Sequence, residues 1–360
     1  MIKQKFMELT EKTIKKLDSA DVLGSVELVP KQAAQAWKES RKIKIPASYK
    51  KATSIVVAGM GGSAIGPHMV RSVLYDKFYV PVQIINGYNL PGYVDGNTVV
   101  LLSSYSGTTE EVLSCAREAK AKRAKIIVLS TGGALEEMAK KYNWPKYIFE
   151  PKWNPCGQPR VATGYAIFGT MGLLSRAGLV RISNSEAELM IKKLAKYSRK
   201  FNFSSPSSKN AAKKLSGKLK NKLLFLIGSE FLEGNMHIMA NQINETSKQF
   251  ASWMLLPEIN HHLLEGLSFP NRPKKDMLFV FFESKKYHPQ VQRRYGLTQQ
   301  IMKKNKIPTV SYKLNETTKL GQAAEILMLS GFISFYLGML NGQDPAFIPW
   351  VKYLKNKLKE

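Results

Sequence analysis

Acidic residues and cysteines are both scarce in this sequence of 360 residues. Asp and Glu number 27 against 54 Lys and Arg, which leaves a formal net charge of +27. This balance favours anionic partners such as phosphorylated metabolites, nucleic acid or a membrane surface. The two cysteines, Cys115 and Cys156, exclude a disulfide-dense secreted scaffold and a zinc site of four thiolates. The 44% of hydrophobic residues is ordinary for a globular protein with a sizeable core.

Features of secreted and membrane proteins are also lacking. The first residues, Met1–Glu8, carry charges where a signal peptide needs an apolar run, so we expect a cytoplasmic protein. Residues 326–340 form an uncharged stretch of fifteen residues, whereas a membrane span takes about 20. Because Ser330 and Gly331 interrupt this stretch, we expect a buried core helix there.

Short apolar runs alternate with helical patterns along most of the chain, after a helical N-terminal segment. The predicted strands are 54–58, 82–85, 98–102, 125–129, 147–149, 223–229 with its turn, 276–282 and 308–312. The predicted helices between and after them include 109–124, 134–142, 230–248 and 289–305. Strands that alternate with helices indicate βαβ units and a mainly parallel sheet.

The order of these elements repeats. Strand–turn–helix at 54–75 returns at 223–248, and strand–helix–strand at 98–129 returns at 276–312. The sequence therefore predicts an α/β protein with two similar subdomains, each a parallel sheet flanked by helices in three αβα layers. The predicted parts are an N-terminal helical segment (1–48), a first, phosphate-binding subdomain (49–185), a basic helical connector (186–222), a second subdomain (223–325) and C-terminal helices that pack on the first subdomain (326–360).

Within the connector, residues 192–222 hold eleven basic residues and no acidic one. This pattern fits solvated helices that bridge the two subdomains. Nucleic-acid binding is the weaker interpretation, because the segment lacks the interleaved aromatic residues of a stacking platform.

A glycine-rich turn, Gly59-Met-Gly-Gly-Ser-Ala64, follows the first predicted strand. It fits the dinucleotide fingerprint, so a nicotinamide-dependent enzyme is one interpretation. That fingerprint also needs an acidic residue after the second strand, where this chain has Asn86-Gly-Tyr. The glycines do indicate a place where backbone closely approaches a bound group, at the positive end of the next helix.

A hydroxyl-rich loop, Ser103-Ser-Tyr-Ser-Gly-Thr-Thr-Glu-Glu111, follows the third predicted strand and opens a helix. The hydroxyls of Ser104, Ser106 and Thr109, together with backbone N–H groups at the helix N-terminus, can cradle a phosphate monoester. An ordinary helix N-cap is the alternative interpretation.

The glycine turn and the hydroxyl loop, some forty residues apart, resemble the sugar isomerase (SIS) fold. Four further motifs resemble the bifunctional phosphoglucose/phosphomannose isomerases: Gln158-Pro-Arg160, Asn241-Gln-Ile-Asn-Glu-Thr246, Pro257-Glu-Ile-Asn-His-His262 and Gly342-Gln-Asp-Pro345 followed by Trp350–Lys355. Together these motifs cover about residues 50–355. The resemblance implies an aldose–ketose isomerase that interconverts glucose 6-phosphate and mannose 6-phosphate with fructose 6-phosphate through a cis-enediol, with no cofactor and no metal.

The resemblance also implies a role for each matched residue. Glu245 moves the proton between C1 and C2, and Arg160 faces the developing enediolate. His261, supplied across the interface of a homodimer, opens the sugar ring, and Lys355 assists at the ring oxygen, with Lys352 as the alternative lysine. The phosphate contacts fall to Ser104, Ser106 and Thr109, and the sugar-hydroxyl contacts to Gly61, Gly62 and Ser63.

Ala346 stands after Asp344-Pro345, where the family usually has a hydroxyl residue. A small side chain at the sugar end leaves the enediol free to rotate about C2–C3, so we expect both aldoses to form from fructose 6-phosphate.

Three other functions are weighed against the isomerase. A non-catalytic SIS-type sugar-phosphate sensor agrees with the basic charge but has no need of Glu245 and His261. A metal-dependent mannose-phosphate isomerase needs zinc-type pairing that the five histidines do not show. The amide-transfer isomerase that makes glucosamine phosphate needs a glutaminase domain, which this sequence lacks.

Overall fold

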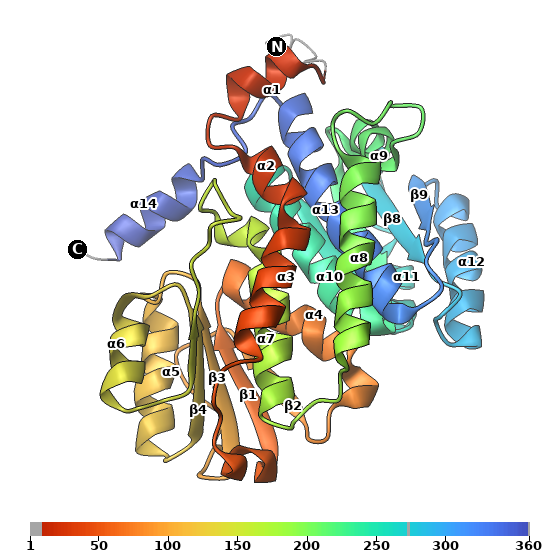
Figure 1. Cartoon of the computed structure of the whole chain (residues 1–360). Helices are drawn as coiled ribbons and strands as arrows, with labels where there is room; N and C mark the ends of the chain where they lie inside the picture. Colours follow the sequence, from red (N-terminus) through yellow and green to blue (C-terminus); the bar gives the residue numbers. More distant parts are fainter. Residues whose placement is uncertain (1–8, 272–273, 359–360) are drawn as a thin grey trace.

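The computed structural model describes residues 9–271 and 274–358, and it contains two parallel sheets (Figure 1). The first sheet has the order β2-β1-β3-β4-β5 and the second β7-β6-β8-β9. The strands are β1 (Ser54–Gly59), β2 (Val82–Ile85), β3 (Thr98–Ser104), β4 (Lys125–Ser130), β5 (Lys146–Ile148), β6 (Leu223–Gly228), β7 (Ala251–Leu255), β8 (Met277–Glu283) and β9 (Thr309–Lys313). The predicted α/β fold with two parallel sheets is confirmed.

The helices are α1 (Glu11–Leu17), α2 (Val22–Glu27), α3 (Val29–Ser40), α4 (Gly62–Val73), α5 (Glu110–Ala121), α6 (Gly133–Lys141), α7 (Thr163–Arg176), α8 (Asn184–Phe201), α9 (Ala211–Leu219), α10 (Glu233–Gln242), α11 (Leu263–Gly266), α12 (Pro289–Lys304), α13 (Lys319–Leu340) and α14 (Pro349–Lys357). Short 3₁₀ turns, written η, lie at Ala47–Lys51, Tyr75–Lys77, Pro159–Val161, Glu230–Leu232 and Glu258–His261, and a π-helical turn lies at Ile243–Ser247.

Burial explains the apolar composition of the central strands. Every residue of β3 is buried, as in parallel strands that are covered on both faces. Val100 and Leu102 pack with Val112 of α5, whereas Val99 and Leu101 belong to the core that α4 and α7 cover. The first sheet is therefore the middle of three layers.

The two sheets correspond strand by strand, since β2-β1-β3-β4 and β7-β6-β8-β9 follow the same sequence order. α4 and α10 follow the corresponding strands β1 and β6, and α5 and α12 follow β3 and β8. The predicted repeat of elements is thus present. The sequence missed β7, and the single helix predicted over 230–248 is instead an η turn, α10 and a π-helical turn.

α4 and α10 pack against each other and join the two sheets. The N–H of Gly234, near the start of α10, donates to Ser72 Oγ, near the end of α4, at 3.1 Å. At the other end, Gln242 Nε2 donates to the carbonyl of Arg160 at 2.8 Å, and Gly62 lies against the Arg160 backbone. The two helices are therefore antiparallel, so the start of α4 lies near the end of α10.

α13 runs through the middle of the molecule and packs against α8, α9 and α10 (Figure 1). By length and composition this helix could cross a membrane, but 94% of its apolar window is buried inside the protein. The expected core helix at 326–340 is therefore confirmed. The predicted domain boundary at 325/326 falls inside α13, and the other predicted boundaries stay predictions; residues 1–8 of the N-terminal segment lie outside the described part.

α14 extends away from the body of the protein, at the left of Figure 1. None of its residues is buried, and Trp350 is 80% exposed. Apolar side chains at Trp350, Leu354 and Leu358 recur every four residues, so they form one exposed stripe.

Candidate functional site

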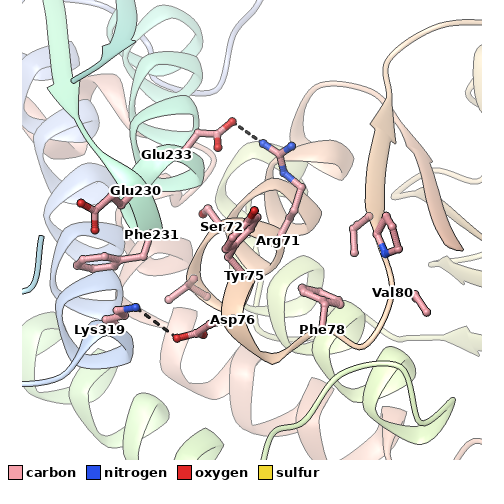
Figure 2. Close-up of a pocket in the computed structure, with 13 residues that line it drawn as sticks. Arg71, Ser72, Tyr75, Asp76, Phe78, Val80, Glu230, Phe231, Glu233 and Lys319 are labelled. Atoms are coloured by element: carbon pink, nitrogen blue, oxygen red, sulfur yellow. Dashed lines mark hydrogen bonds and ion pairs between the residues drawn. The ribbon is translucent and has the colours of Figure 1, made fainter. Parts of the chain in front are cut away.

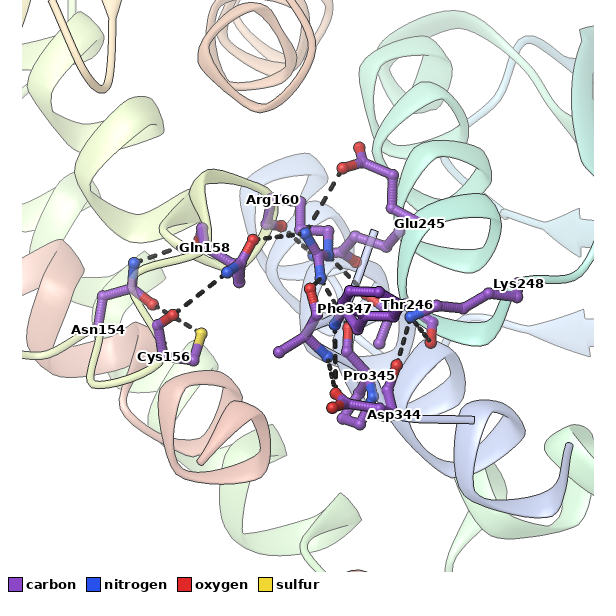
Figure 3. Close-up of polar contacts among 12 residues, drawn as sticks. Asn154, Cys156, Gln158, Arg160, Glu245, Thr246, Lys248, Asp344, Pro345 and Phe347 are labelled. Carbon is purple, nitrogen blue, oxygen red and sulfur yellow. Dashed lines mark hydrogen bonds and ion pairs between the residues drawn. The ribbon is translucent and has the colours of Figure 1, made fainter. Parts of the chain in front are cut away.

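Arg160 lies at the centre of the candidate site and is buried, with 1% of its surface exposed. Its Nε donates to Thr246 Oγ1 at 3.1 Å and its Nη1 to Gln158 Oε1 at 2.8 Å (Figure 3). Its Nη2 donates to the carbonyls of Pro345 and Ala346, at 2.6 and 3.0 Å. All three guanidinium nitrogens are thus bonded, which fixes the orientation of this charge.

Glu245 approaches Arg160 from the π-helical turn that follows α10. Its Oε2 lies 3.6 Å from Arg160 Nη1, and 29% of its side chain is exposed. Burial raises the pKa of Glu245, while the nearby charges of Arg160, Lys355 and Lys248 oppose that rise. At 3.6 Å the contact with Arg160 is an ion pair and longer than a hydrogen bond. The exposed part of the carboxylate can therefore contact a ligand.

Lys248 is a third charged residue of this cluster, and the sequence analysis missed it. Its ammonium donates to the carbonyl of Asp344 and, at 3.4 Å, to that of Thr246 (Figure 3). Burial, with the repulsion of Arg160, lowers the pKa of Lys248 to about 8. Its position three residues beyond Glu245 in the sequence could have indicated that it belongs to the site.

The glycine turn borders this cluster at the start of α4. A Cβ on Gly62 would lie 2.7 Å from the carbonyl carbon of Pro159 and 2.8 Å from Arg160 N, so only glycine permits this approach. Ser63 Oγ accepts from the N–H of Tyr105 at 2.8 Å, and Ser103 Oγ donates to the Ser63 carbonyl at 2.8 Å. Ser63 therefore connects the glycine turn to the hydroxyl loop. Gly61 precedes them at the N-cap of α4, with a φ of +46°.

The hydroxyl loop lies between β3 and α5. Ser104 Oγ and Thr109 Oγ1 are 2.8 Å apart, and Ser106 Oγ lies 3.0 Å from Thr108 Oγ1. Thr109 is the N-cap of α5, yet its side chain makes no capping hydrogen bond. The first N–H groups of α5 are thus not taken by the cap residue, which leaves them for an anion at this helix terminus.

The corresponding helix of the second half, α12, has a closed N-terminus. His288, its N-cap, accepts from the N–H of Gln290 at 3.2 Å, and Glu230 Oε1 accepts from the N–H of His288 at 2.8 Å. Tyr287 next to them is 2% exposed. The side chains of Glu230 and His288 thus accept from backbone N–H groups at the start of α12, whereas no side chain caps the start of α5.

His261 and Lys355 are placed differently from the cluster. His261 is exposed at the end of an η turn, and the described residues provide its side chain with no hydrogen bond or ion pair. Lys355 is exposed on α14, close enough to Glu245 to oppose its protonation, and Lys352 is exposed on the same helix. The structure therefore brings Arg160 and Glu245 together but not His261.

A metal site is not apparent within residues 9–271 and 274–358. No three or more His, Cys, Asp and Glu side chains of these ranges gather where they could hold a metal ion.

Known proteins resemble this chain over nearly its full length. The family description "Bacterial phospho-glucose isomerase C-terminal SIS domain" matches residues 208–358. A bifunctional phosphoglucose/phosphomannose isomerase of Caldicellulosiruptor bescii is 33% identical, over 93% of this chain and 98% of the relative. One of Aquifex aeolicus is 27% identical, over 90% and 94%.

Solved structures agree on the fold. A hypothetical protein from Thermus thermophilus superposes with a TM-score of 0.74 at 14% identity, over 97% of this chain and 92% of that one. A glucose-6-phosphate isomerase from Chlamydia trachomatis gives 0.65 at 13% identity, over 91% and 72%. From its close match to the C. bescii relative along both chains, this protein belongs to the family of bifunctional phosphoglucose/phosphomannose isomerases, which are enzymes with the SIS fold.

Proposed function

We propose that the protein interconverts fructose 6-phosphate with both glucose 6-phosphate and mannose 6-phosphate. The observation that carries the proposal is the Glu245 carboxylate, 3.6 Å from Arg160, whose three guanidinium nitrogens all donate hydrogen bonds. The relatives named as bifunctional phosphoglucose/phosphomannose isomerases support the substrate class.

The phosphate binds at the hydroxyl loop. Ser104, Ser106 and Thr109 supply hydroxyls, and the start of α5 supplies N–H groups and the positive end of its dipole. Because the N-terminus of α12 is closed by side chains, the phosphate is assigned to α5 of the first half and not to α12 of the second. The N–H groups of Gly61 and Gly62 then hold the sugar hydroxyls near Arg160, whereas the N–H of Ser63 donates to the Met60 carbonyl at 3.0 Å.

Glu245 is the base that carries the proton between C1 and C2 on one face of a cis-enediol. Its raised pKa suits a group that must both take and return a proton. Arg160 keeps its charge fixed beside the carboxylate, where it stabilises the negative charge of the enediolate without reorganising.

His261 and Lys355 catalyse the opening of the sugar ring. Because His261 is exposed and has no partner in the described part of its own chain, we propose that it acts in the site of a second subunit. Lys355 acts from α14 at the ring oxygen, since it is already within electrostatic reach of Glu245.

Ala346 supports formation of both aldoses. Its carbonyl accepts from Arg160 Nη2 at 3.0 Å, so this position borders the arginine that faces the enediolate. A methyl side chain there leaves room for the intermediate to rotate about C2–C3 before it is reprotonated.

The test is to incubate the protein with fructose 6-phosphate in D₂O, and to identify the products and the deuterium at C2. We expect both aldoses, at rates within about an order of magnitude of each other. Glu245→Gln should lower C2 exchange by about 10²- to 10⁴-fold while binding persists. Glu137→Gln, at an exposed glutamate of α6, is the matched control. Absence of both aldoses from the wild-type reaction would overturn the proposal.

A further inference from the structure

A pocket of about 740 Å³ lies between the two halves, away from the site described above (Figure 2). Arg71 and Tyr75 line it from the end of α4 and the turn that follows, and Glu233 and Phe231 from the start of α10 and the η turn before it. α4 and α10 are antiparallel, so this pocket lies at the opposite end of the helix pair from Gly62 and Glu245. The ten residues of α10 separate the two ends by about 15 Å. The volume is in the usual range for small-molecule sites.

Two ion pairs cross this pocket from one half of the protein to the other. Arg71 of α4 pairs with Glu233 of α10. Lys319 Nζ, at the start of α13, lies 3.4 Å from Asp76 Oδ2, which follows α4. A third carboxylate, Glu230, also lines the pocket. The walls therefore carry both hydrogen-bond donors and hydrogen-bond acceptors.

The repeat of the fold gives this pocket a counterpart in the proposed catalytic site. The end of β6 and the start of α10 correspond to the end of β1 and the start of α4. Asp76 is the third residue after α4 ends (76 − 73 = 3), as Glu245 is after α10 ends (245 − 242 = 3). Each end of the helix pair thus carries a carboxylate that follows the helix ending there and pairs with a cation.

The charges distinguish the ligand of this pocket from a sugar phosphate. Three carboxylates face two cations, and both cations are already paired, so no excess positive charge is present to hold a phosphate. The exposed ring of Tyr75 offers a flat apolar surface beside these polar groups, whereas Phe231 is buried against Tyr287. Carboxylates that accept from hydroxyls, together with an aromatic ring that covers a C–H face, suit a sugar without a phosphate.

We propose that this pocket is a second ligand site and that it binds an uncharged, polyhydroxylated molecule of hexose size, such as a free hexose or hexitol. The inference rests on the lining of the pocket and on the internal repeat, and it does not require the proposed isomerase activity.

The test measures binding of glucose and of sorbitol to the full chain by saturation-transfer NMR and titration calorimetry. We expect saturable binding with a Kd of the order of 1 mM that excess glucose 6-phosphate does not displace. Tyr75→Ala and Asp76→Asn should each weaken it by at least about tenfold. The matched control is Tyr79→Ala, since Tyr79 is 66% exposed and does not line the pocket. Glu245→Gln should bind glucose as the wild type does.

Three results would overturn the proposal: no saturable binding, full affinity in both folded pocket variants, or displacement by glucose 6-phosphate with loss of binding in Glu245→Gln. The last result would place the hexose in the catalytic site instead. Melting temperatures establish that each variant is folded. Because binding is read without turnover, failure here and failure of the isomerase proposal are distinguishable.

Discussion

Arg160 shows how a single buried charge can organise a site. An unpaired buried cation is costly, but here a hydroxyl, an amide oxygen and two carbonyls accept from it, and Glu245 lies beside it. These acceptors belong to segments far apart in the sequence, around residues 158, 246 and 345. The guanidinium therefore joins those segments and keeps its charge directed at one place.

The pH dependence of activity should report the charges around Glu245. A base must be ionised, so kcat/KM should fall as the pH drops through the pKa of Glu245, which burial raises above its usual value. Lys248 is one of the cations that lower this pKa, so Lys248→Met should move the acidic limb to higher pH. The measurement is the pH profile of kcat/KM for both proteins. Lys248→Arg keeps the charge and should leave the limb in place; an unchanged limb in Lys248→Met contradicts the assignment.

Ser106 tests the hydroxyl loop. Ser106→Ala should raise KM for sugar phosphates more than it lowers kcat, because phosphate binding is nearly the same in the ground and transition states. Steady-state kinetics with fructose 6-phosphate measure the two effects, and Ser207→Ala, at an exposed serine far along the sequence, is the control. A normal KM in Ser106→Ala would mean that the hydroxyl of Ser106 does not bind the phosphate.

For single residues, the sequence identified candidate side chains of the site better than it predicted the contacts around them. Arg160 and Glu245 were named from motifs, and the structure places them 3.6 Å apart. Lys248 was missed, because its altered pKa arises from burial and from Arg160, 88 positions away (248 − 160 = 88), and no local pattern reveals that contact. The roles of all the named residues stay predictions.

β7, the hydroxyl loop before α5 and the turn before α12 show which structural features a local sequence pattern can predict. β7 was missed because Ala251-Ser-Trp-Met-Leu255 is a short edge strand of mostly half-buried residues, without the continuous apolar run of β3. The hydroxyl loop was predicted from its serines and threonines. The closure of the α12 N-terminus by Glu230 could not be, since Glu230 and His288 meet only in the folded chain.

α14 carries both candidate lysines. The charge of Lys355 lowers the pKa of Glu245, and Lys352 lies one turn earlier on the same helix. We therefore expect Lys355→Ala to lower kcat at least about tenfold and Lys352→Ala to change it little. Steady-state kinetics of the two variants, which lose the same charge, provide the comparison. Equal losses, or a larger loss in Lys352→Ala, would transfer the role to Lys352.

For the whole molecule, the repeated order of elements was enough to predict two parallel sheets. It was not enough to predict how the halves meet. Helical periodicity does not say which neighbour a fully apolar helix packs against, so the boundary predicted at 325/326 cut α13, which packs against α8, α9 and α10 as one continuous helix. The same limit applies to His261, whose proposed site lies outside its own chain.

Subunit exchange tests that proposed sharing of a site. His261→Ala and Glu245→Gln should each be inactive alone, and a mixture allowed to exchange subunits should recover activity. One of the two sites in a mixed dimer would then hold both wild-type residues, so about a quarter of wild-type activity is expected after statistical exchange. Activity is measured after mass spectrometry of labelled subunits verifies mixed dimers. Verified mixed dimers without activity would mean that each site is built within one chain.

The π-helical turn at Ile243–Ser247 makes the position of Glu245 sensitive to insertion and deletion. A π turn amounts to one residue added to an α-helix, and each residue of an α-helix turns the chain by about 100°. Loss of one residue between Gln242 and Glu245 would therefore restore regular helix and turn the carboxylate away from Arg160. A related protein that keeps the carboxylate beside the arginine must therefore keep this segment at its present length.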